Sequence, residues 1–186
     1  MSGADRRRQV LAIAAEEFAE NGLHGASTET IARRAEITQA YVFRMFGTKK
    51  ALFLEVVLAA FDRVTEGMRA AAGAEGGLEA LGRMGARYNE LLSDRTSLLL
   101  ELQGFAACGD PEVRDAVREC FGRMWQAVAE VTGLDPVTIK AFLGFGMLLN
   151  NSAALGAGEV DEPWARGIRT RIRPGLFDHI TTETNK

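Results

Sequence analysis

The sequence contains little cysteine or histidine, with two residues of each among 186. Cys108 and Cys120 form no CxxC pair, so we expect free, buried thiols that pack as small apolar side chains in a reducing cytoplasm. His24 and His179 stand far apart, and no HExxH, GxSxG or phosphate-binding-loop motif occurs. These absences predict a protein that is not an enzyme and that holds no metal or cofactor.

Proline is also scarce, with four residues and none before position 111. In three cases an acidic residue comes directly before the proline. An acidic side chain can accept from an unpaired backbone N–H at a helix start, and proline fits the first helical position. The fourth proline, Pro174, follows a basic run and predicts a helix end. The three predicted helix starts are Asp110-Pro111, Asp135-Pro136 and Glu162-Pro163.

Long apolar runs are absent except at residues 141–158, which carry no charged side chain. A membrane span needs about 20 mainly apolar residues, whereas this stretch includes Asn150, Asn151 and four glycines. We therefore expect a buried helix, apolar on more than one side and suited to a partner chain, and no membrane association. The amino terminus has no apolar region typical of a secretory signal, because Glu16 and Glu17 interrupt it.

Helical periodicity runs through the rest of the chain, and no segment alternates convincingly as a strand does. The fold class is therefore predicted as all-α, with about nine helices. A long stripe precedes Gly133, and a second begins near Thr48. The first stripe is Val113, Val117, Phe121, Met124, Val128 and Val131.

Charge is divided unevenly along the chain, which has a net charge of −3. Residues 1–50 carry eight Lys or Arg and six Asp or Glu, a balance of +2, and residues 51–186 carry −5. A basic segment attached to an acidic one is compatible with a phosphate backbone at one end only. We therefore divide the chain into a head, residues 1–50, and a body, residues 51–186.

Within the head, the pattern matches a helix-turn-helix. A first helix ends near Asn21-Gly22, Ser27 can cap a short helix over Thr28–Ala35, and Thr38 can cap another over Gln39–Met45. The second helix of such a pair enters the major groove with its amino-terminal residues. Glutamine there can make a bidentate contact with adenine.

At this point a resemblance becomes specific. The stretch TIARRAEITQAYVFRMFGTKKALF, residues 30–53, with the upstream FAENG, resembles the head of TetR-type (tetracycline-repressor-like) regulators over residues 8–58. The resemblance implies phosphate contacts for Thr28 and Lys49. It also implies packing roles for Ile31, Val42, Phe46 and Leu52. The base-reading surface that it implies consists of Thr38, Gln39, Ala40, Tyr41 and Arg44.

Some basic residues keep an alternative interpretation. Arg44 is either a DNA contact or a solvated surface charge. The three consecutive arginines Arg6, Arg7 and Arg8 either contact DNA or form an ordinary charged arm.

Three residues depart from the family pattern. Glu36 stands where a glycine is usual in the turn, and a non-glycine residue in a left-handed conformation costs about 1 kcal/mol. Phe43 replaces a tyrosine and Met45 replaces a polar residue, so fewer phosphate contacts are expected. The alternative function is therefore a helical protein-interaction module with weakened or lost DNA binding.

For the body, the resemblance implies an effector pocket between helices and a dimer interface formed by the last two helices. Candidate pocket residues are Met84, Tyr88, Phe105, Trp125 and Met147, with plain core as their alternative. Their chemistry favours a small, mainly apolar ligand. The predicted function is a cytoplasmic homodimeric repressor that binds a palindromic double-stranded operator and leaves it when an effector binds. The helix beginning near Thr48 would connect the two parts.

Overall fold

The computed structural model describes residues 2–170, without the side chain of Arg169, and this part is helical throughout with no strand. The predicted all-α class and the expectation of about nine helices are therefore confirmed for these residues. Pro174 and His179 lie outside the described residues. The elements are α1 (Gly3–Gly25), α2 (Thr28–Arg34), α3 (Gln39–Phe46), α4 (Lys49–Ala71), α5 (Gly77–Leu91), α6 (Arg95–Ala106), α7 (Pro111–Thr132), α8 (Pro136–Ala154), a 3₁₀ turn η1 (Ala157–Glu159) and α9 (Pro163–Arg169).

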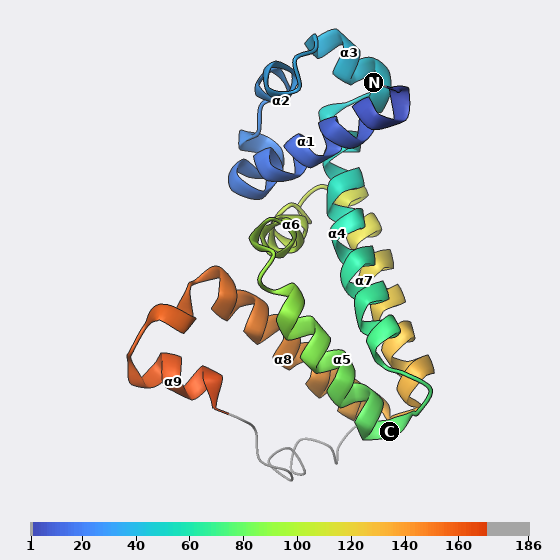
Figure 1. The fold of residues 1–186 in the computed structure, drawn as a ribbon, viewed down its shortest axis with the longest axis vertical. Helices are drawn as coiled ribbons and strands as arrows, with labels where there is room; N and C mark the ends of the chain where they lie inside the picture. The colour runs from blue at the N-terminus through green and yellow to red at the C-terminus, as the bar shows by residue number, and fades with distance from the viewer. Residues whose placement is uncertain (1, 171–186) are drawn as a thin grey trace.

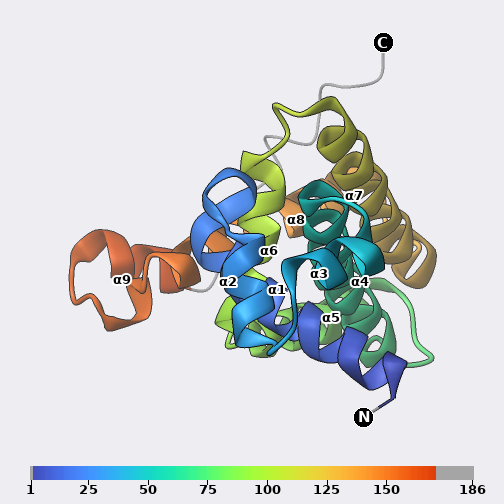
Figure 2. The same ribbon diagram turned by 90° about the horizontal axis from the view of Figure 1, so that it is seen from above.

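The helices are arranged around the long helix α4. Helices α1–α3 gather at one end of the molecule, and α4 runs from this end beside α7 (Figure 1). Helix α6 packs against both α1 and α4, and α5 lies beside α8. Seen from above, α2 and α3 lie over the end of the bundle (Figure 2). Helix α4 therefore contacts both the head and the body.

The predicted helix starts of the head are confirmed. Ser27, Thr38 and Thr48 each precede a helix in extended conformation, and each hydroxyl accepts a backbone N–H in the first turn. The break predicted near Asn21-Gly22 is also present, because Gly22 leaves the helical conformation with φ 64°. A side chain at Gly22 would collide with α6, since a Cβ there would lie 2.6 Å from Gln103 Oε1.

The three described proline starts are confirmed in position. Asp110 and Asp135 accept backbone N–H groups of α7 and α8, and Gly133 ends α7 in the left-handed conformation with φ 63°. Glu162 precedes α9, but its side chain accepts no capping hydrogen bond. The proline therefore marks the start of α9 correctly, whereas the predicted capping by the Glu162 side chain is absent.

One apolar core continues from the head into the body. Ile31, Val42, Phe46 and Leu52, predicted to pack the head, are all buried. The rings of Phe18 and Phe53 meet edge to face, with centroids 5.2 Å apart. The same core extends along α4 toward α5 and α7. The boundary at residue 50 remains a prediction, because packing is continuous across it.

Two further expectations concern thiols and membranes. Cys108 and Cys120 are both free thiols; Cys120 is buried, as predicted, whereas Cys108 is only half-buried, so the prediction of burial was wrong for Cys108. Among the described helices, none combines the length and apolarity needed to cross a membrane.

Candidate DNA-binding surface and effector cavity

The turn between α2 and α3 is held in an unusual backbone conformation. Glu36 has φ 55°, and no other described non-glycine residue has a positive φ. The N–H of Ile37 donates to the carbonyl oxygen of Ala32 over 3.0 Å, and so closes the turn. The strain predicted for Glu36 is therefore present. The exposed carboxylate of Glu36 lies in this turn, three residues before α3 begins.

The first residue of α3 is positioned by α2. Gln39 Nε2 donates a hydrogen bond of 2.7 Å to Thr28 Oγ1, which joins the amino-terminal ends of the two helices. Thr28 is buried, whereas Thr38, Gln39 and Ala40 are exposed. This contact fixes the Gln39 side chain before any ligand binds, with its amide oxygen still able to accept a hydrogen bond.

Farther along α3, Tyr41 and Arg44 form a stacked pair. The guanidinium carbon of Arg44 lies 4.4 Å from the centroid of the Tyr41 ring. Phe43, which replaces a tyrosine of the family pattern, is 39% exposed. The structure thus brings Gln39, Ala40, Tyr41 and Arg44 onto one short helix at the end of the molecule.

Lys49 has a structural role that the sequence did not predict. Its Nζ donates to the carbonyl oxygens of His24 and Ala26, each 3.1 Å away, and so holds the end of α1 against the start of α4. An ammonium group has three donors. One N–H therefore remains available for a phosphate oxygen.

The three arginines near the amino terminus all contact protein groups. Arg6 Nη1 donates to the carbonyl oxygen of Ala35 over 3.1 Å, at the end of α2. Arg7 pairs with Glu55 over 2.7 Å, and its guanidinium lies 4.8 Å from the centroid of the Phe46 ring. Arg8 pairs with Asp5. These contacts favour the interpretation as a charged arm over that of a free DNA-contacting arm.

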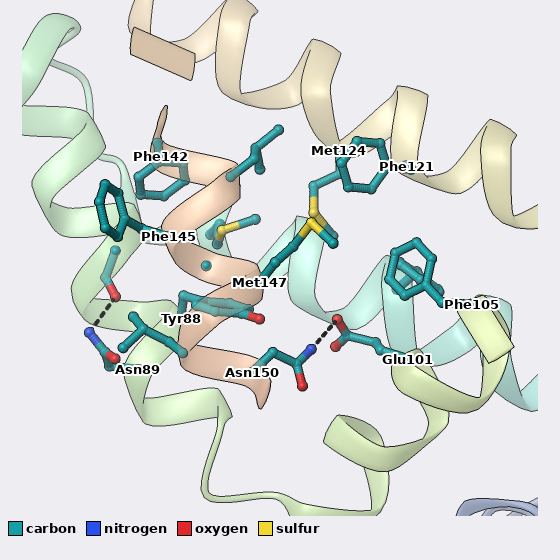
Figure 3. A pocket seen from close by; sticks show the side chains of 16 residues that line it. Tyr88, Asn89, Glu101, Phe105, Phe121, Met124, Phe142, Phe145, Met147 and Asn150 are labelled. Carbon is teal, nitrogen blue, oxygen red and sulfur yellow. Dashed lines mark hydrogen bonds between the residues drawn. The ribbon is translucent and has the colours of Figure 1, made fainter. Parts of the chain in front are cut away.

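The body contains a cavity of about 160 Å³ between α4, α5, α6, α7 and α8, shown in Figure 3. Its walls are mainly apolar, and none of the described lining residues is a lysine or an arginine. The aromatic residues of the lining are Phe61, Tyr88, Phe105, Phe121, Phe142 and Phe145.

Three of the predicted pocket residues line this cavity and two do not. Tyr88, Phe105 and Met147 are in the lining. Met84 is fully buried in the core one turn before Tyr88 on α5, and Trp125 lies beside the lining residue Met124 on α7. Consecutive residues of a helix point about 100° apart, so Trp125 is directed away from the space that Met124 faces.

The sequence analysis missed the polar group of the cavity. Glu101 on α6 is 5% exposed, and it accepts a hydrogen bond of 3.3 Å from Asn150 Nδ2 on α8. Burial raises the pKa of Glu101 to about 8. Burial, followed by the negative charge of Glu101, also raises the pKa of Tyr88. A single acidic residue within the apolar run 98–107 was the available signal.

Helix α4 connects the two sites. Its first residue, Lys49, contacts the end of α1, and Phe61 and Met68 farther along line the cavity. Next to Lys49, Lys50 Nζ lies 3.1 Å from an Asp110 carboxylate oxygen and 2.6 Å from one of Glu112, at the start of α7.

No cluster of three or more potential metal ligands occurs among the residues that the structure describes.

Comparison with known proteins assigns the head. Residues 10–56 match the family described as bacterial regulatory proteins, tetR family. The HTH-type transcriptional activator FasR of Mycolicibacterium smegmatis is 34% identical over 67 residues, which are 36% of this chain and 31% of FasR. The match therefore spans about a third of the length of this relative.

Solved structures extend the likeness to the whole fold. A TetR-family transcriptional regulator from Mesorhizobium loti has a TM-score of 0.68 and 24% identity, over 91% of this chain and 92% of that chain. FadR from Bacillus subtilis in complex with stearoyl-CoA has a TM-score of 0.69 and 16% identity, over 83% of this chain and 90% of that chain. At these identities the likeness concerns the fold alone.

Proposed function

The chain belongs to the TetR family of bacterial regulatory proteins, and from this premise we propose that it is a homodimeric repressor released from a palindromic operator by a small, mainly apolar ligand. DNA binding and transcriptional regulation are the activities of this family. The repressor role, the dimer and the ligand response are the proposed part.

The surface of α3 supports sequence-specific recognition. Gln39 is exposed at the start of the helix and is held by Thr28, so little side-chain freedom is lost when it contacts a base. Arg44 and the third donor of Lys49 supply positive charge for phosphates. Phe43 and Glu36 offer no such contact, so fewer phosphate contacts are expected than in the family pattern.

Exposed apolar side chains on α8 and α9 support the dimer. Met147, Leu148 and Trp164 are 45%, 40% and 50% exposed, and Leu155, just after α8, is 71% exposed. Large exposed apolar side chains are typical of an interaction surface. A second copy packed there would bring two recognition helices onto one operator, whose half-sites lie about 34–36 Å apart.

The observation that carries the ligand response is the continuity of α4. One unbroken helix begins in the head and forms part of the cavity wall through Phe61 and Met68. A ligand that prefers a conformation with a different spacing of the two heads would shift the population away from the DNA-binding state.

The cavity also constrains the ligand. The FadR structure contains stearoyl-CoA, a polyanionic molecule with a long acyl chain. The cavity of this chain measures about 160 Å³ and contains the carboxyl group of Glu101, and residues 2–170 contribute no basic side chain to its lining. These features favour a smaller ligand without negative charge.

Selection of bound duplexes from a random pool, at stated salt concentrations, tests the DNA-binding part. We expect a palindromic sequence whose affinity falls steeply with added salt, because bound counterions are released from the phosphates. No enrichment at any salt would contradict this function and favour the protein-interaction module. Sedimentation of the free chain tests the dimer, and a promoter fusion distinguishes repression from the activation that the name of FasR indicates.

A further inference from the structure

The effector cavity has one polar corner in an otherwise apolar lining. Glu101 from α6 and Asn150 from α8 point toward each other there, with Tyr88 beside them (Figure 3). Both polar side chains are more than nine-tenths buried, at 5% and 4% exposure. The remaining walls are aromatic or aliphatic, apart from Asn89, which is exposed and donates to the Gly85 carbonyl oxygen on its own helix.

When Glu101 is ionised, this corner offers acceptors without a matching donor among the described residues. Asn150 Oδ1 has no hydrogen-bond partner, and no other buried side-chain N or O atom of the described residues lacks one. Its amide nitrogen is already bound to Glu101, which forms no ion pair with any described residue. An unpaired buried acceptor is destabilising. A ligand carrying several N–H donors would satisfy both groups at once.

We propose that the cavity binds a small arylalkylamine in its cationic form, with the ammonium group between Glu101 and Asn150 Oδ1 and the ring against the aromatic walls. This inference rests on the proposed function in one respect, since it takes this cavity as the effector site. An ammonium donates three hydrogen bonds and compensates the carboxylate charge. A carboxylate ligand would be repelled, and an alcohol has one donor for two acceptors.

The size of the cavity matches one aromatic ring. Engineered apolar cavities of about 150 Å³ bind benzene, and this cavity measures about 160 Å³. Phe105 and Phe121 meet edge to face with centroids 6.2 Å apart, so they form a continuous aromatic wall near Glu101. Aromatic faces also attract a cation placed over them.

The charged groups near Glu101 in the described structure do not pair with its carboxyl group. From α4, Arg63 lies in a small neighbouring pocket that Glu101 also lines, but it pairs with Asp94 over 2.6 Å. From α5, Tyr88 is the only titratable residue of the described lining besides Glu101. Helices α7 and α8 contribute uncharged residues to the lining. Within the part of the chain that the structure describes, the carboxyl group therefore has no cationic partner that would compete with the ligand.

Calorimetric titration of the full chain tests the proposal with three probes of similar shape. These probes are phenethylamine, phenethyl alcohol and phenylacetate. At about pH 9 the amine is expected to bind about ten-fold or more tightly than the alcohol, since a hydrogen bond to a charged group contributes about 1.5–3 kcal/mol. Phenylacetate is expected not to bind.

Two variants locate the effect. Glu101→Gln keeps the size of the side chain and its contact with Asn150 but removes the charge, so the preference for the amine should disappear while the alcohol still binds. Glu66→Gln makes the same substitution on the exposed surface of α4, outside the cavity lining. It should bind all three probes as the original chain does. Thermal melting verifies that both variants are folded.

The pH dependence gives a second readout. Glu101, with its pKa of about 8, must be ionised to pair with the ammonium, which itself stays protonated to about pH 10. Amine affinity should therefore rise about nine-fold between about pH 7 and about pH 9. The alcohol, and the amine with Glu101→Gln, should show no such rise.

Equal binding of amine and alcohol, tighter binding of phenylacetate, or no binding of any probe would overturn the proposal. None of these results depends on DNA. If the amine binds through Glu101 but no duplex is bound at any salt, the proposed regulatory function fails and the amine site stands. If a duplex is selected but the amine does not bind, the regulator stands and the amine site fails.

Discussion

Polar side chains of the head and of the cavity in the body differ in how fully they are paired with other protein groups. In the head, Arg6, Lys49 and Gln39 each have a protein partner within 3.1 Å, so the surface of α3 is held in place before DNA arrives. In the cavity of the body, Glu101 pairs with no cation among residues 2–170, and Asn150 Oδ1 accepts no hydrogen bond from these residues. The polar groups near α3 are therefore held by protein contacts, whereas the cavity keeps an unused acceptor, on which the proposed ligand site rests.

The two regions nevertheless share one core, and the largest expected effect concerns this link. Phe53 is fully buried on α4 against Phe18 of α1. Phe53→Ala should lower the free energy of unfolding by about 3–5 kcal/mol, through lost burial and the cavity left behind. Urea unfolding followed by fluorescence and circular dichroism measures this.

A single transition is expected for that variant, because the core is continuous. Phe43→Ala, at an exposed position of the neighbouring α3, is the matched control and should change stability by about 0.5 kcal/mol or less. Two separate transitions would instead mean that head and body unfold independently.

The next effect concerns the unfilled corner of the body. The pKa of Glu101 is about 8 in the folded chain, against an ordinary value of 4.5. The associated stability is fully present below pH 4.5 and is lost as pH rises toward 8. Glu101→Gln should therefore match the original chain at low pH and exceed it by a few kcal/mol above pH 8.

Denaturant unfolding across this pH range measures the difference between the two chains. For Glu66→Gln, at an exposed position, the free energy of unfolding should change with pH as it does for the original chain. If the free energy of unfolding of Glu101→Gln also changes with pH as that of the original chain does, burial does not hold the carboxyl group neutral. The difference between the two regions would then be smaller.

A smaller effect is expected at the start of α3. Gln39→Ala should weaken operator binding by about 1–3 kcal/mol, because a bidentate contact with a base is lost. Fluorescence anisotropy with the selected duplex measures it. Gln126→Ala, exposed on α7, is the control and should leave affinity unchanged. If Gln39→Ala and Gln126→Ala bind the selected duplex with equal affinity, Gln39 is not part of the base-reading surface.

The smallest effect concerns the turn before α3. Glu36→Gly should stabilise the chain by about 1 kcal/mol, because glycine adopts φ 55° without strain. It should also strengthen DNA binding by removing a negative charge near the phosphates. Glu36→Gln separates the two causes, since it removes the charge and keeps the strain. Thermal melting measures the stability of both variants, and anisotropy measures their affinity for DNA. A Glu36→Gly variant that is no more stable than the original chain would contradict the strain assigned to Glu36.

The sequence predicted the fold well where local chemistry decides it. Ser27, Thr38, Thr48 and the Asp-Pro pairs set helix starts through contacts within one turn, so they could be read from neighbouring residues. The strained turn at Glu36 was also predicted, through the comparison with glycine in the family pattern.

The sites were harder to predict because they depend on contacts between distant segments. The bond between Gln39 and Thr28 joins two helices, and Lys49 contacts carbonyl groups of α1. The pairing of Glu101 with Asn150 spans 49 positions of the chain, and periodicity on α6 cannot reveal it. Trp125 and Met84 share the apolar character of pocket residues but face the core, which only the packing of the helices decides.

The most direct test of the account measures operator affinity of the full chain with and without saturating phenethylamine, at about pH 9. If the cavity and the α3 surface are coupled through α4, the amine should weaken operator binding by about ten-fold, and the operator should weaken amine binding by the same factor. Bound amine with unchanged operator affinity would contradict the coupling of the two sites.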